Sequence, residues 1–197
     1  MTDHRLLQAF CWSAYSVQTE LHRTHLALGL EREQSVLSGS THALIAPYVR
    51  QFSSRTEEDA DFMTEHYKLF YMLENEIRDF VSQILEAEDE HGWWQNLVPD
   101  AVAKSAERNR SREVKEGVTV RSSRNIDYIN FGELGEIIKS NWSVFAGVFS
   151  NSDITAIEKV MARLNMLRNY IAHCSAFGDD EILRLHLTIR DWFRLME

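Results

Sequence analysis

A chain of 197 residues with 44% hydrophobic and 26% charged residues has the composition of a folded globular protein, which excludes a disordered one. The net charge of −9 argues against a general nucleic-acid coat protein, because affinity for phosphate backbones comes largely from Lys and Arg. Two cysteines exclude a disulfide framework. No apolar stretch has the features of a signal peptide or reaches membrane-spanning length, so we expect a cytoplasmic protein without a membrane partner.

The chain has only 2 Pro and 8 Gly, so helix-breaking residues are scarce and an all-α fold is expected. Apolar spacing predicts helices over residues 4–30, 43–52 and 56–87, a helix pair or one kinked helix over 133–149, one helix that follows Asn151, Ser152 and Asp153, and a last one over 179–196. Thr56 is the expected cap of the longest helix.

Polar residues on the longest helix, Glu74, Glu76 and Arg78, are candidates to contact a functional site. For Glu74 the favoured interpretation is an exposed, ion-paired face of the helix. His22 and His25 are three residues apart, with His42 as a distant third. Because no Cys or carboxylate completes a ligand pattern, we expect surface histidines, no metal site and no cofactor.

Basic residues gather in the segment that follows, although the whole chain is acidic. They are Lys104, Arg108, Arg110, Arg112, Lys115, Arg121 and Arg124, interspersed with Glu107, Glu113 and Glu116. Such a segment can steer an anionic ligand to one place on an acidic protein. A solvated, mobile connection explains the same composition equally well.

The helix after Asp153 carries an apolar stripe in alternating steps of three and four, formed by Ile157, Val160, Leu164, Leu167 and Ile171. Since an α-helix turns ~100° per residue, Asn169 and His173 share a face nearly opposite that stripe. Ala162, Asn165 and Met166 lie on the same face, and Ala172 flanks it. None of these positions is charged, so we expect a partner to cover the face, and a symmetric dimer would do so.

Arg168 lies at the edge of the apolar stripe, where its side chain can swing toward the uncharged face. A histidine can move protons near neutral pH, an arginine can hold a phosphoryl group, and an asparagine can orient an oxygen. Together they suit attack of an RNA 2′-hydroxyl on the neighbouring phosphate without a metal. Alternatively, Arg168 and His173 only cap a helix end or bond backbone carbonyls, and spacing alone favours this alternative.

The run from Arg168 to His173, Arg-Asn-Tyr-Ile-Ala-His, resembles the Arg-X4-6-His motif of the HEPN superfamily. The upstream segments 127–138 and 141–142 resemble the HEPN subtype first described at the end of a yeast nuclear RNA-surveillance endonuclease. The resemblance covers roughly residues 60–197. It implies an up-and-down helical bundle over 56–197 that dimerises at the motif. The residues before it have no counterpart in the family, and we expect a helical extension over 1–55.

The resemblance also implies a metal-independent endoribonuclease, an activity common among bacterial toxins and phage-defence proteins. His173 would be the general acid or base, Arg168 would stabilise the phosphorane, and Asn169 would orient the site. The basic side chains expected to bind RNA are Lys104, Arg108, Arg110, Arg112, Arg121 and Arg124. The alternative is a non-catalytic HEPN module that binds a protein or nucleotide partner, such as a nucleotidyltransferase-like antitoxin or another regulatory protein.

Overall fold

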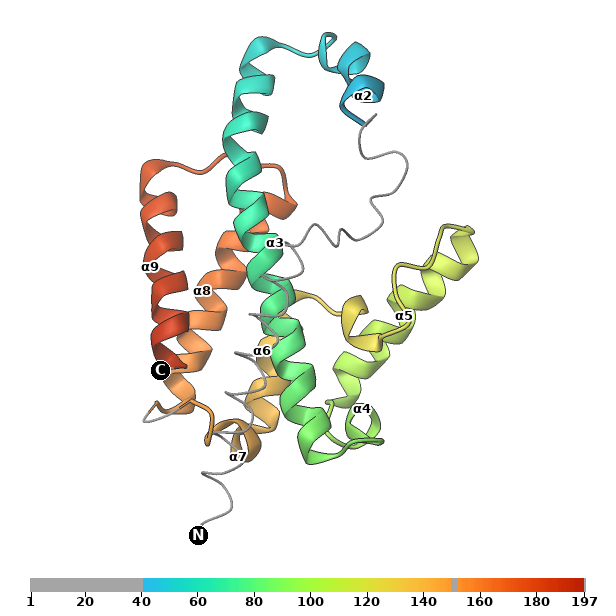
Figure 1. Ribbon diagram of the computed structural model, residues 1–197, viewed down its shortest axis with the longest axis vertical. Coiled ribbons are helices and arrows are strands. Elements are labelled where there is room, and N and C mark those ends of the chain that lie inside the picture. The colour runs from blue at the N-terminus through green and yellow to red at the C-terminus, as the bar shows by residue number, and fades with distance from the viewer. Residues whose placement is uncertain (1–40, 150–151, 197) are drawn as a thin grey trace, which may run out of the picture. The chain divides into compact units, whose positions relative to one another are not determined.

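The computed structural model describes residues 41–149 and 152–196 (Figure 1). The elements are α2 (Thr41–Val49), α3 (Ser54–Glu88), α4 (Trp93–Asn96), α5 (Asp100–Glu116), the 3-10 helix η1 (Asn125–Tyr128), α6 (Phe131–Ser140), α7 (Trp142–Phe145), α8 (Ile154–Ala172) and α9 (Asp179–Leu195). No strand occurs in the described ranges, which confirms the predicted all-α fold. The predicted helix over 4–30, including His22 and His25, lies outside them.

The chain divides into two units, residues 1–61 and 62–197. In the first unit, α3 begins at Ser54, two residues before the expected cap Thr56. The hydroxyl Oγ of Ser53 accepts a hydrogen bond from the backbone N–H of Thr56 at 3.2 Å. Ser53 therefore serves as the cap, because Thr56 lies inside the first turn and its N–H is one of the donors that a cap must satisfy. The predicted division at residue 55 stays a prediction.

The core of the second unit joins α3 to the C-terminal helices. Phe80 of α3 packs its ring against Phe145 and Trp192, with ring centroids 6.0 Å and 6.1 Å away. α8 packs against both α6 and α9 (Figure 1). The faces that these helices bury are the apolar stripes expected from their sequence, since Ile77, Leu164 and Leu185 are all fully buried.

Two contacts show that α3 and α8 run in opposite directions. Glu74 of α3 pairs with Arg168 of α8, and further along, the backbone N–H of Phe177, just beyond α8, lies 3.3 Å from Sδ of Met63 on α3. A short turn then reverses the chain from α8 into α9. The alternating directions of α3, α8 and α9 give the up-and-down arrangement that the resemblance implies.

Small residues let α6 approach α8 closely. A Cβ on Gly135 would lie 3.5 Å from Cβ of Met161, and one on Gly132 would lie 3.2 Å from Nδ2 of Asn165. Asn130 fixes the start of α6 through a capping box with Glu133, in which each side chain accepts the other residue's backbone N–H. The N-terminus of α6 is thereby placed beside the polar face of α8.

Candidate functional site

α8 carries the candidate site on the side that faces away from the core. The side chain of Asp153 caps its start, accepting the backbone N–H of Ala156 at 2.9 Å. The face opposite the core stripe is open in the described chain. Its exposed members are Ala162, Met166, Asn169, Ala172 and His173, and Asn165 is half-buried beside Gly132.

Arg168 points across the helix contact to α3. Its Nε lies 3.6 Å from Oε2 of Glu74, and the other oxygen of that carboxylate accepts a hydrogen bond from Nη2 of Arg78 at 2.7 Å. The side chain of Glu74 is only 17% exposed. The expectation of an exposed, ion-paired face for Glu74 is therefore confirmed for the ion pairs and wrong for the exposure, because Arg78 and Arg168 both lie against the carboxylate. The expected swing of Arg168 toward Asn169 and His173 is not observed, since Glu74 attracts the guanidinium to the other side.

Arg78 links this carboxylate to the backbone around η1. Its Nε donates to the carbonyl of Ile126 at 3.2 Å, and its Nη2 lies 3.5 Å from the carbonyl oxygen of Ile129. The side chain of Arg78 is 9% exposed, and Asn75 accepts a further bond at 3.2 Å. A buried guanidinium with several acceptors is held in one orientation, and a fixed Arg78 in turn fixes Glu74. Arg168 thus receives its orientation from residues far away in sequence.

His173 lies where α8 ends rather than within the helix. Its N–H still bonds the carbonyl of Asn169 at 2.9 Å, so the two residues remain on one face. The N–H of Ser175 then bonds the carbonyl of Tyr170 at 2.8 Å, and Cys174 adopts a left-handed φ of 53°. This pattern is a Schellman termination with cysteine at the position that usually holds glycine. The imidazole is exposed and, within the described chain, makes no hydrogen bond to Arg168.

The basic segment separates into two groups. Arg110, Arg121 and Arg124 serve the packing of η1. The guanidinium of Arg110 donates to Asn125 at 3.2 Å and lies 6.0 Å from the ring centroid of Tyr128, while that of Arg121 binds Glu113 and lies 5.3 Å from the same ring. Arg124 pairs with Asp127 at 2.8 Å and with Asp79 at 2.7 Å.

These pairs shift the titration of their acids. Burial opposes ionisation of Asp127, but hydrogen bonds from Arg124 and Ser122 outweigh it and hold the pKa of Asp127 below its usual value. Burial also opposes ionisation of Glu113, where bonds from the backbone and side chain of Arg121 lower the pKa. The hydrogen bond to Asp127 raises the pKa of Arg124. Arg110, Arg121 and Arg124 are therefore engaged in the structure of this region.

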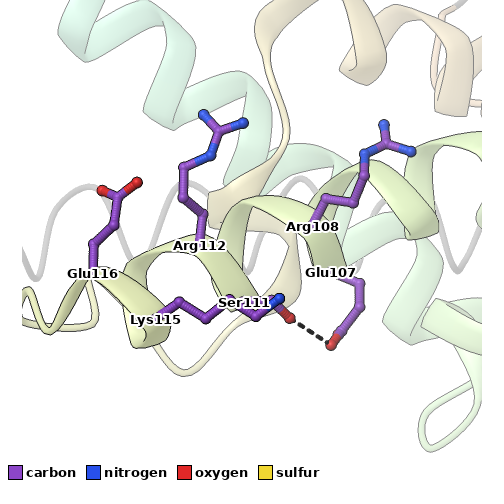
Figure 2. A pocket seen from close by; sticks show the side chains of 6 residues that line it. All are labelled: Glu107, Arg108, Ser111, Arg112, Lys115 and Glu116. Carbon is purple, nitrogen blue, oxygen red and sulfur yellow. Dashed lines mark hydrogen bonds between the residues drawn. The ribbon is translucent and has the colours of Figure 1, made fainter.

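The other basic side chains lie on the outer face of α5. Lys104, Arg108, Arg112 and Lys115 are exposed, and no ion pair engages them among the described residues. Figure 2 shows Arg108 and Arg112 extending to the same side of the helix, and both side chains help to line a hollow on α5. Glu107 and Glu116 flank this hollow, and Ser111 donates a hydrogen bond to Glu107 at 3.1 Å. The segment is helical here, so it is not merely a connection.

Metal-binding and membrane-spanning features are absent from the described ranges. Residues 41–149 and 152–196 contain no group of three or more His, Cys, Asp or Glu side chains that could hold a metal ion. No helix in these ranges is long and apolar enough to cross a membrane. Trp93 and Trp94 are partly buried and pack against the core.

Comparison with known families gives one result. The family model described as Swt1-like HEPN matches residues 68–197, which include α8 and the Arg168-to-His173 motif. No curated protein and no solved structure matches the chain.

Proposed function

Because the chain belongs to the Swt1-like HEPN family, we propose that it is a metal-independent endoribonuclease with Arg168, Asn169 and His173 as its catalytic residues. The observation that carries the proposal is their grouping at the end of α8. Asn169 and His173 are exposed on one face of the helix. The guanidinium of Arg168 is oriented by its contact with Glu74 of α3, and the side chain of Arg168 stays 35% exposed. An oriented cation and an exposed imidazole within six residues at the end of one helix suit phosphoryl chemistry, which a second copy of the chain would complete.

In the proposed reaction an RNA 2′-oxygen attacks the adjacent phosphorus while an imidazole removes the proton of the 2′-hydroxyl. The bond from phosphorus to the 5′-oxygen breaks, and that oxygen receives a proton, which leaves a 2′,3′-cyclic phosphate and a 5′-hydroxyl. Arg168 stabilises the charge of the phosphorane, and Asn169 orients the reacting groups. No metal takes part in any step.

The site is composite in this proposal, built from two copies of the chain. Ala162, Asn165, Met166 and Ala172 form the contact, because an exposed helix face without charge suits burial against a second copy. His173 of one copy would act as the base and that of the other as the acid. Asn165→Glu or Ala172→Glu should therefore separate the dimer and abolish cleavage together. A fully active monomer would contradict the composite site.

RNA reaches this site over the outer face of α5 in the same proposal. Lys104, Arg108, Arg112 and Lys115 offer unpaired positive charge to phosphates. We assign the protein to the cytoplasm as a toxin or phage-defence effector, with an antitoxin or another regulatory protein as its partner.

The test is cleavage of RNA by the purified protein in EDTA, beside His173→Ala and Arg168→Ala. Each variant should lose at least about 100-fold in rate, the scale of general acid–base and electrostatic catalysis. His186→Ala and Arg163→Ala are matched controls, because both side chains are exposed, His186 on α9 and Arg163 on α8. Products should carry 2′,3′-cyclic phosphate ends.

A second function, that of a non-catalytic binding module, is favoured by one observation. Arg168 already faces the carboxylate of Glu74, and an arginine committed to a carboxylate has less to offer a phosphate. The absence of cleavage of any RNA by protein shown to be folded and dimeric would support this function. The exposed face of α8 would then be the surface to use for capture of a protein or nucleotide partner.

A further inference from the structure

Two exposed tyrosines stand on α3 above the residue that orients Arg168. Tyr67 is 56% exposed and Tyr71 is 60% exposed, and their ring centroids lie 6.2 Å apart at an interplanar angle of 41°. Tyr71 precedes Glu74 by three residues and Tyr67 precedes it by seven. Residues at this spacing lie along one stripe of a helix, so both rings lie on the same side of α3 as Glu74.

This stripe runs beside the last turns of α8. The pairing of Glu74 with Arg168 marks one end of the shared stretch, and the contact of Met63 with Phe177 marks the other. Because the helices are antiparallel, the part of α3 between these contacts lies level with the chain from Arg168 to Phe177, which includes the end of α8. At 1.5 Å of rise per residue, Tyr71 and Tyr67 lie about 4.5 Å and about 10.5 Å along the axis from Glu74.

Both polar and apolar side chains surround the two rings, since Lys68 and Asn75 lie close by in the chain and Met72, next to Tyr71, is 48% exposed. Lys68, next to Tyr67 in the chain, pairs loosely with Glu65 at 3.9 Å, and Asn75 lies one turn beyond Tyr71. Neither tyrosine hydroxyl makes a hydrogen bond to another described residue, and neither ring belongs to the core. Exposed aromatic faces with polar groups and the cationic Lys68 nearby suit a ligand that is both aromatic and anionic.

We propose that Tyr67 and Tyr71 form a stacking site for unpaired nucleobases of single-stranded RNA, next to the phosphate held by Arg168. This inference rests on the proposed ribonuclease function and names the substrate class more closely. Every base has a face that stacks on an aromatic ring, so the site tolerates different sequences. It requires unpaired bases, because the bases of a duplex are already stacked on their neighbours.

The experiment measures binding of a short single-stranded RNA whose 2′-hydroxyls are methylated, so that the catalytically intact protein cannot cleave it. The full chain is compared with the double variant Tyr67→Ala/Tyr71→Ala and with Tyr67→Phe/Tyr71→Phe. Loss of both rings should weaken binding at least roughly tenfold, and phenylalanine should restore it because stacking needs no hydroxyl. Tyr48→Ala is the matched control, since Tyr48 is 65% exposed but lies on α2, and it should bind as the parent does.

Two further measurements separate base stacking from attraction between charges and from a changed assembly. Abasic nucleotides in the RNA should weaken binding by the parent protein but should not weaken binding by the alanine variant further. A duplex of the same sequence should bind the parent and the alanine variant equally. Sedimentation of each variant shows whether the oligomeric state changes.

Three results would overturn the inference. Equal affinity of parent and alanine variant for the single strand would overturn stacking and leave the proposed nuclease intact. A change of oligomeric state in the alanine variant would assign the rings to an interface between copies. Binding of no RNA by the parent, together with no cleavage, would remove the proposed function as well as the stacking site.

Discussion

Glu74 and Arg168 join α3 to α8 through a carboxylate that is already engaged, since its second oxygen binds the buried guanidinium of Arg78. One negative charge therefore lies between two positive ones. Arg168 therefore shares the carboxylate of Glu74 with Arg78, whose Nε also lies 3.8 Å from Oδ1 of Asp127. In the proposed reaction, a phosphate that approaches Arg168 would meet a cation oriented by a shared partner, 3.6 Å away, rather than by a tight ion pair.

Replacing Glu74 with glutamine tests this arrangement. Glu74→Gln keeps the shape of the side chain but weakens its hold on Arg168, so the guanidinium should lose its fixed position. We expect kcat for RNA cleavage to fall roughly tenfold, with little change in KM, because orientation contributes mainly in the transition state. Steady-state kinetics in EDTA measure both constants.

The control for this substitution is Glu65→Gln. Glu65 lies on the same helix with a side chain 77% exposed, and its loss should leave both constants unchanged. A rise in KM with unchanged kcat in Glu74→Gln would show that Glu74 contributes to ground-state binding and not to orientation. An unchanged enzyme would show that Arg168 is positioned by other groups.

The sequence predicted the parts of the site that depend on helical periodicity. The stripe from Ile157 to Leu167 predicted which face of α8 packs on the core, and therefore that Asn169 and His173 lie on the opposite face. The family motif then assigned chemistry to those residues. Both inferences use only neighbours within one helix, whose relative directions follow from a constant turn per residue.

Contacts between distant segments could not be predicted in this way. Arg78 bonds the carbonyl of Ile126, 48 residues away, and a backbone acceptor leaves no signature in the sequence. The orientation of the Arg168 side chain toward α3 depends in turn on the position of the Glu74 carboxylate. The Tyr67–Tyr71 pair could have been predicted, because its spacing with Glu74 is helical, but its position near the end of α8 follows only from the antiparallel packing.

The division of the basic segment into side chains that pack around η1 and side chains that are exposed on α5 likewise could be recognised only in the structure. Charge reversal of Arg108 and Arg112 should weaken RNA binding for all sequences, because these exposed side chains are expected to contact phosphates. The slope of log affinity against log salt should fall by roughly 1 for each phosphate that the protein no longer neutralises. Fluorescence anisotropy at several salt concentrations measures it.

Arg121→Glu provides the contrast to that experiment. Arg121 binds Glu113 and lies over the ring of Tyr128, so its reversal should lower the free energy of unfolding with a smaller effect on the salt slope. Urea unfolding of the same samples measures the stability. A salt slope reduced as much by Arg121→Glu as by Arg108→Glu would place Arg121 on the RNA path.

Acid should destabilise the region around η1 through Asp127. Its pKa in the folded protein lies below the usual value of about 3.9, so its ionised form contributes stability above that pH. That contribution should disappear as the pH falls from about 4 through the lower folded pKa. Urea unfolding at a series of pH values should show that the free energy of unfolding falls less in acid for Asp127→Asn than for the parent. The control is Asp180→Asn, at an exposed position on α9, which should lose as much stability in acid as the parent does. If Asp127→Asn also loses as much stability as the parent, other acidic residues are responsible.

Cys174 terminates α8 in a conformation that its side chain disfavours. With φ of 53°, its Cβ crowds the backbone, whereas glycine adopts this conformation without that cost. Cys174→Gly should raise the free energy of unfolding by about 1 kcal/mol, part of the gain being offset by the greater entropy of glycine in the unfolded chain. Cys174→Ala keeps the Cβ and should have the stability of the parent.

The same variants test whether the thiol beside His173 has a chemical role. Both Cys174→Gly and Cys174→Ala should keep RNA cleavage, since the turn that presents the imidazole is set by backbone bonds such as Ser175 N–H to the Tyr170 carbonyl. Loss of cleavage in both variants, with stability unchanged in Cys174→Ala, would assign a function to the thiol. A loss confined to Cys174→Gly would instead show that a rigid turn after α8 is needed to hold His173 in place.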